Sequence, residues 1–94
     1  MTVEQKQKLL VDYMVEVVRY YDLKTEEFIM KLPLIHKRVF SKLTDEEYKE
    51  YREWFGENVP RDLYDRYIDH IANTDLDAPR ETIYEYMRGF DNEQ

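Results

Sequence analysis

The chain contains no cysteine, two glycines, three prolines and no long hydrophobic run. The absence of cysteine excludes disulfides, iron–sulfur ligation and thiol chemistry, and it suits a reducing compartment. Apolar runs are no longer than Leu9–Leu10–Val11, whereas a membrane span needs about 20 apolar residues. The first residues, Met-Thr-Val-Glu-Gln, have no basic segment followed by an apolar one. We therefore expect no membrane span, no secretory signal and a cytoplasmic location.

Groups that carry chemistry are equally scarce. Ser41 is the single serine, and Gly56 and Gly89 fall where helices are predicted to end, so no glycine-rich phosphate loop can form. His36 and His70 lack the neighbouring His or Cys of a transition-metal site. The many carboxylates are expected on helix exteriors, where nothing raises a pKa into a catalytic range. We expect a protein that is not an enzyme and that binds neither a metal nor a cofactor.

Negative charge is what the sequence has in excess, and it is unevenly distributed. The 94 residues carry a formal charge of −7. Residues 1–43 have eight basic against six acidic side chains, while residues 44–94 have six against fifteen. No acid lies between Glu27 and Asp45. Clustered charge of one sign raises the local potential and steers an oppositely charged partner onto one face.

Helix signals follow one another along the chain. Thr2 with Gln5, and Thr44 with Glu47, match the capping box that opens a helix. Pro33 is expected to stop one short helix and open the next. No β-hairpin signal is present. The apolar spacing predicts helices over about 3–21, 26–32, 34–42, 45–55 and 60–73, and a last one that begins near Asp77 and ends near Gly89.

We therefore predict one all-α domain over residues 1–94, a compact bundle of five or six helices. The first helix is expected to be long and mostly buried, because only Asp12, Glu16 and Arg19 form a polar stripe in its second half. Such a helix is covered either by the other helices or by a second copy of the chain. The sequence leaves a monomer and a homodimer both open.

The acidic half predicts a binding surface. Its acids recur on the outer sides of two predicted helices and are interleaved with aromatic residues, which are favoured anchors in interfaces. We predict a non-catalytic adaptor or inhibitor that occupies a basic surface of another protein, including by imitation of nucleic-acid phosphates. In size and charge alone it is analogous to small inhibitors of phages, plasmids and toxin–immunity systems. The simpler alternative is a solvated face whose tyrosines belong to the core. The predicted contact residues are Glu46, Glu50, Glu53, Trp54, Asp62, Asp65 and Asp69.

An alternative hypothesis concerns the basic segment 31–42. A short capped helix, a break at Pro33 and a second helix with basic residues outward resemble a helix-turn-helix motif in pattern. This motif would imply a DNA-binding transcriptional regulator. Many such units have glycine at the break, and a sequence pI of about 4.8 provides little of the positive charge that phosphates attract. The residues that would contact nucleic acid are Lys31, His36, Lys37, Arg38 and Lys42.

Overall fold

The secondary structure is entirely helical over residues 1–92, the part of the chain that the computed structural model describes, with side chains described for residues 1–89. The helices are α1 (Val3–Arg19), α2 (Thr25–Phe40), α3 (Asp45–Asn58), α4 (Arg61–Ile71) and α5 (Arg80–Asn92). This confirms the all-α prediction. The molecule measures 34 × 33 × 27 Å along its principal axes, so the helices form a compact body.

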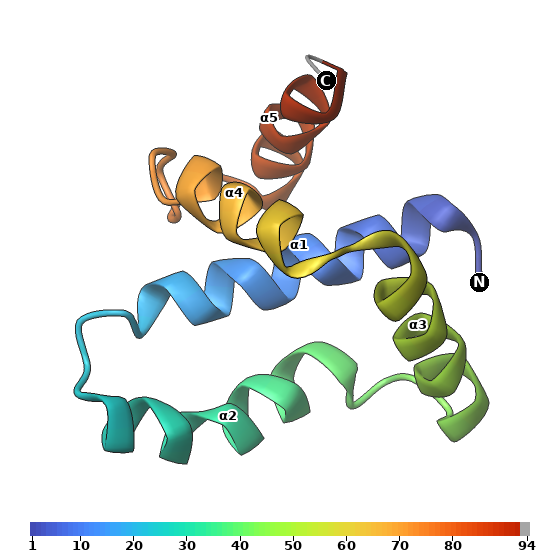
Figure 1. Cartoon of the computed structure of the whole chain (residues 1–94), viewed down its shortest axis with the longest axis horizontal. Coiled ribbons are helices and arrows are strands. Elements are labelled where there is room, and N and C mark those ends of the chain that lie inside the picture. Colours follow the sequence, from blue (N-terminus) through green and yellow to red (C-terminus); the bar gives the residue numbers. More distant parts are fainter. Residues whose placement is uncertain (93–94) are drawn as a thin grey trace.

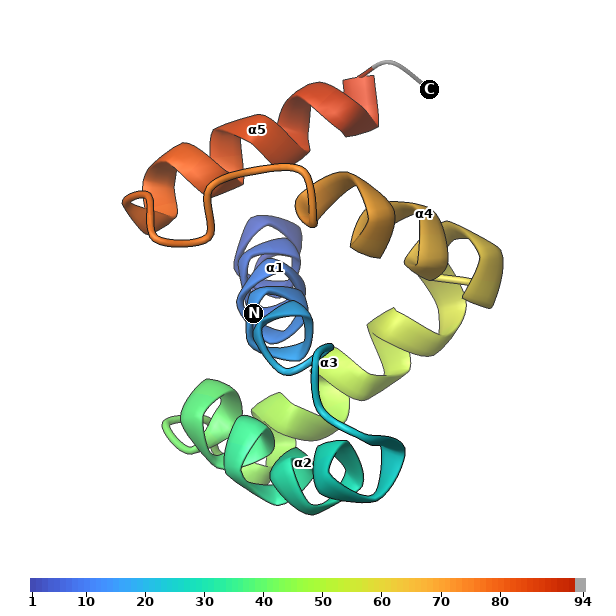
Figure 2. The same ribbon diagram turned by 90° about the vertical axis from the view of Figure 1, so that its left-hand side faces the viewer.

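The helices are arranged around α1. Figure 1 shows α1 running across the molecule, with α2 below it and α4 and α5 above it. Figure 2, which looks along α1, shows the same arrangement, with α3 joining the α2 side to the α4 side. α1 contacts α2, α4 and α5, and α4 also contacts α5. No helix in the described part combines the length and the apolarity that crossing a membrane requires.

The helices that supply buried residues to the core cluster are α1, α2, α4 and α5. Its most completely buried side chains are Met14, Val15, Ile35, Ile71 and Ile83. α1 supplies the largest share of the buried residues, five of its 17. Its first turns are nevertheless exposed. The expectation of a mostly buried first helix is therefore not confirmed, since only the side of α1 that faces its neighbours is covered.

α2 corrects the sequence prediction at Pro33. The chain does not break there: α2 is one helix of 16 residues that contains Pro33 in its interior. Phe28, Leu32, Ile35 and Val39 recur at helical spacing on both sides of the proline, and all four pack into the core. Burying this one face outweighs the backbone hydrogen bond that proline cannot make. The predicted helix-turn-helix motif is therefore wrong.

The helix boundaries follow local signals only in part. Both predicted capping boxes are present, with Thr2 and Thr44 each accepting a hydrogen bond from the third helical residue. α3 continues through Gly56 to Asn58, and α5 starts at Arg80 instead of near Asp77. Gly56 has ordinary helical backbone, without a positive φ. The glycine is tolerated inside α3 because nothing at this position requires a left-handed turn.

Candidate interaction surfaces

The outer side of α3 carries a row of carboxylates, which we call the α3 acidic stripe: Glu46, Glu50, Glu53 and Glu57. Their spacing of four, three and four residues places them on one side of the helix, and all four are exposed. Tyr51, on the opposite side, is buried. Glu57 extends the stripe by one turn beyond the predicted contact residues, because α3 is longer than predicted. The sequence spacing alone was enough to find this surface.

Glu50 differs from the rest of the stripe. It accepts a hydrogen bond from the Met1 ammonium at 3.1 Å, and the Lys6 ammonium lies 3.6 Å from its Oε1. The hydrogen bond from the Met1 ammonium and the charge of Lys6 hold the pKa of Glu50 below its usual value. The negative charge of the Glu50 carboxylate is thus already balanced by two ammonium groups of the chain itself. Among the described residues, Glu46, Glu53 and Glu57 have no ion-pair partner.

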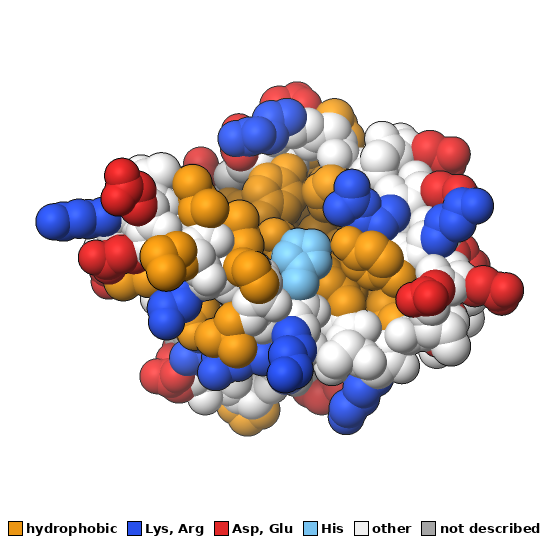
Figure 3. Space-filling view, turned by 90° about the horizontal axis from the view of Figure 1, so that it is seen from below, with side chains coloured by type: hydrophobic (Ala, Val, Ile, Leu, Met, Phe, Trp, Pro, Cys, Tyr) orange, Lys and Arg blue, Asp and Glu red, His pale blue; other side chains and the backbone are white. Residues whose placement is uncertain are grey.

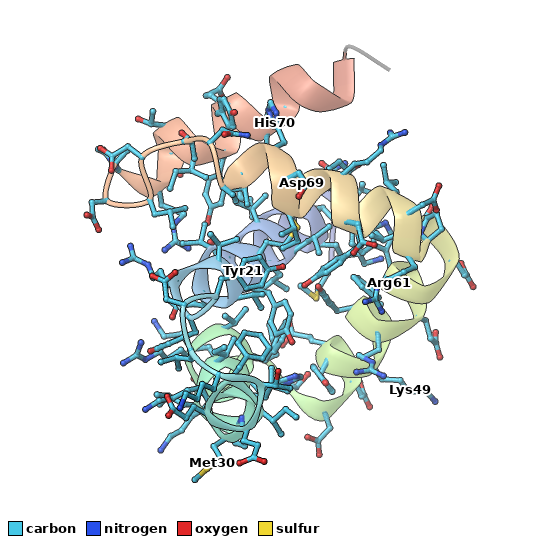
Figure 4. The ribbon with its side chains drawn as sticks, turned by 60° about the vertical axis from the view of Figure 1, so that its left-hand side comes forward. Tyr21, Met30, Lys49, Arg61, Asp69 and His70 are labelled. Atoms are coloured by element: carbon cyan, nitrogen blue, oxygen red, sulfur yellow. The ribbon has the colours of Figure 1, made fainter. Side chains whose placement is uncertain are left out.

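The predicted aspartates lie on α4. Asp62, Asp65 and Asp69 are exposed on one side of this helix, and Asp65 accepts a hydrogen bond from Arg61 at 3.3 Å. Burial, followed by the charges of Asp65 and Asp69, raises the pKa of Tyr21 in the turn after α1. Figure 4 shows Asp69 on α4 and Tyr21 beneath it. The structure therefore divides the predicted acidic face between two helices, and the α4 part lies beside the α1–α2 turn.

Trp54 lies on the inner side of α3. It is half-buried, packs against the core and lines a cavity of about 270 Å³. The other walls of this cavity come mainly from α1, α4 and α5, and they include Leu10, Met14, Tyr67 and Met87. The indole thus packs α3 onto the core, and the acidic stripe, on the outer side, does not include it.

An aromatic groove of about 110 Å³ separates α2 from α3. It is lined by Tyr13, His36, Phe40, Tyr48, Tyr51, Arg52 and Phe55. The Phe40 ring lies 5.1 Å from the ring of Tyr51 and 5.3 Å from that of Tyr48, distances at which aromatic rings attract each other. Burial raises the pKa of the Tyr13 hydroxyl. Figure 3, seen from below, shows hydrophobic side chains gathered around a histidine on this side of the molecule.

The predicted nucleic-acid contacts are divided by this arrangement. His36 lies in the groove, with its ring 5.5 Å from that of Tyr13. Arg38 donates to Glu16 and to the Tyr20 hydroxyl, each at 3.4 Å, so it joins α2 to α1. The other three are exposed: Lys31 and Lys37 lie on α2, and Lys42 lies in the turn after it. The five residues therefore do not form one outward-facing recognition surface.

A polar contact between α1 and α5 was not predicted from the sequence. Oδ1 of Asp12 accepts hydrogen bonds from Arg80 at 2.5 Å and from the Tyr84 hydroxyl at 2.7 Å. Burial and this hydrogen bond raise the pKa of Tyr84. The one available signal was the position of Asp12 on a polar stripe between apolar neighbours, because a partly buried acid needs a partner.

Within the part of the chain described, no group of three or more histidines and carboxylates is placed to hold a metal ion. Comparisons of the chain with family models, with curated proteins and with solved structures find no match.

Proposed function

We propose that this chain is a non-catalytic, acidic protein-binding domain, an adaptor or inhibitor that occupies a basic surface of another protein. The observation that carries this proposal is the state of Glu46, Glu53 and Glu57. They are exposed on one side of α3 and have no ion-pair partner among the described residues. Like charges one turn apart destabilise a helix. A cationic partner relieves that repulsion.

Three acids on other parts of the chain contrast with the α3 acidic stripe. Asp12, Glu16 and Asp77 each pair with an arginine from another part of the chain, so they hold helices together. Among the described residues, the α3 acidic stripe forms ion pairs only with Met1 and Lys6, both through Glu50. With a formal charge of −7, the chain attracts basic surfaces at long range, which increases the rate of encounter. The absence of cysteine suits the cytoplasm, which we keep as the compartment of this proposal.

Charge reversal on α3 tests the proposal. The test variant is Glu46→Lys/Glu53→Lys/Glu57→Lys. The matched control is Asp22→Lys/Glu27→Lys/Glu81→Lys, which reverses three exposed acids elsewhere and changes the net charge equally. Tagged wild-type and variant chains are used to capture partners from nuclease-treated lysate of the source cells, and far-ultraviolet circular dichroism checks that each variant is helical.

The wild type and the control are expected to retain the same protein, and the α3 variant to lose it. Reversing the contacts of a charged interface weakens binding by at least about tenfold, because like charges then face each other. Equal retention by all three chains would contradict the proposal. Recovery of nucleic acid alone, lost on nuclease treatment, would instead favour the exposed lysines of α2 as the binding surface.

A further inference from the structure

The side of α2 that faces away from the core is apolar at its centre. Ile29 is 56% exposed, Met30 78% and Leu34 37%, and Pro33 between them is exposed as well. Figure 4 shows Met30 pointing away from the rest of the molecule. Scattered apolar residues are common on protein surfaces, but adjacent ones on a single helix face mark an interaction site. We call Ile29, Met30, Pro33 and Leu34 the α2 outer patch.

Opposite charges flank the α2 outer patch. Glu26 lies one turn before Met30, and Lys37 lies one turn after Pro33. Both are exposed, and neither has an ion-pair partner among the described residues. The four positions 26, 30, 33 and 37 are separated by four, three and four residues, which keeps them on one side of the helix. The order along this side is thus acid, apolar, apolar, base.

This order is self-complementary when a second helix runs in the opposite direction. With a two-fold axis passing between Lys31 and Leu32, Glu26 faces Lys37 of the second copy. In the same register Met30 faces Pro33, and Ile29 faces Leu34. We propose that the α2 outer patch binds a second copy of this chain, with the two α2 helices antiparallel. Such an interface is isologous, because the same residues of both copies meet across the axis.

Charge complementarity favours a second copy of the chain as the partner and the antiparallel orientation of the two α2 helices. A parallel pair would place Glu26 against Glu26 and Lys37 against Lys37, whereas the antiparallel pair forms two opposite-charge contacts. The apolar patch supplies the attraction, and the charged ends set the register. The net charge of −7 on each copy opposes association. That repulsion is screened beyond about 8 Å at physiological ionic strength. One helix face per copy is a small interface, so the dimer is expected to form in a concentration-dependent way.

A charge-swap experiment tests this proposal on the full chain. Sedimentation equilibrium near physiological ionic strength, from low micromolar to several hundred micromolar protein, measures the average mass. The wild type is expected to rise from 11.7 kDa toward twice that mass. Glu26→Lys alone and Lys37→Glu alone each place like charges across the axis and are expected to raise the dissociation constant by at least about tenfold.

The double variant Glu26→Lys/Lys37→Glu is the decisive control. It has the net charge of the wild type and restores opposite charges at both ends, so the dimer is expected to return. A wild type that stays monomeric at every concentration would overturn the proposal. So would a dimer that ignores the single reversals, or one that the double variant does not recover.

The two proposals can fail separately. The triple α3 variant described above leaves the α2 outer patch intact and reduces the net negative charge, so it is expected to dimerise at least as readily as the wild type while losing the captured protein. The single reversals at Glu26 and Lys37 change exposed side chains only, and their helical circular dichroism shows whether they are folded. Loss of the dimer with a wild-type helical signal therefore reports on the α2 interface itself.

Discussion

Asp12 shows how one side chain joins distant parts of this chain. Its Oδ1 atom accepts from both Arg80 and Tyr84, so its removal leaves a guanidinium and a half-buried hydroxyl without their acceptor. Asp12→Ala is expected to lower the free energy of unfolding by about 1–3 kcal/mol, measured from urea denaturation. Asp22→Ala, at an exposed position, is the control and is expected to change it by less than about 0.5 kcal/mol. Equal effects of the two substitutions would contradict the assigned role of Asp12.

For single residues, the sequence predicts whether a side chain is exposed better than it predicts which distant residue that side chain contacts. The glutamates of the α3 acidic stripe lie on the outer side, as helical spacing predicted. The ammonium of Met1 beside Glu50 could not be predicted, because 49 residues separate the two. The inward position of Trp54 follows from how α3 meets the other helices, and no local pattern contains that information.

At the scale of the helix, Pro33 is the residue expected to lower the stability of α2. Proline in a helix interior is about 3 kcal/mol less favourable than alanine, and its rigidity in the unfolded chain returns about 0.4–1 kcal/mol of that difference. Because Pro33 is exposed, Pro33→Ala is expected to raise the free energy of unfolding by about 1–3 kcal/mol. Urea denaturation at low micromolar protein, where association is negligible, measures this change.

Pro60→Ala is the control for that substitution. Pro60 is the N-cap of α4, where its φ of −64° suits the proline ring, so no comparable gain is expected. Destabilisation by Pro33→Ala would contradict this expectation.

The elements were predictable where local signals and packing agree. The capping boxes at Thr2 and Thr44 opened helices as predicted, and the apolar spacing predicted helix in the region of each observed helix, although it divided α2 into two. Local signals failed where packing opposed them. Pro33 and Gly56 both indicated helix ends, yet both lie inside helices, because the inner face of α2 is continuous across Pro33 and Gly56 has no left-handed backbone that would end α3. Helix propensities give the free-energy cost of a residue inside a helix, and only the tertiary fold shows whether the free energy gained by burying side chains exceeds that cost.

At the scale of the whole molecule, tyrosines set the alkaline limit of stability. Burial raises the pKa of Tyr51 and Tyr64, and burial with the hydrogen bond to Asp12 raises the pKa of Tyr84, above the usual 10.0. Just above pH 10, these hydroxyls stay protonated in the folded chain but ionise in the unfolded chain. Their contribution to stability is complete below pH 10 and is lost as the pH rises further.

We therefore expect a cooperative alkaline transition in which tyrosinate absorbance and the loss of helical circular dichroism coincide. Tyr51→Phe removes one of the ionising groups and is expected to flatten the dependence of stability on pH above 10. A rise of all the tyrosinate absorbance before any helix is lost would contradict this explanation.

α3 contributes to the fold mainly through one of its sides. It buries one residue, Tyr51, and meets the rest of the molecule through aromatic rings and through Glu50, while Glu46, Glu53 and Glu57 form no ion pair among the described residues. Substitution of Glu46, Glu53 or Glu57 therefore removes no ion pair among the described residues. The sequence at these three positions can vary without loss of a core contact, whereas variation on the inner sides of the helices packed around α1 changes the core.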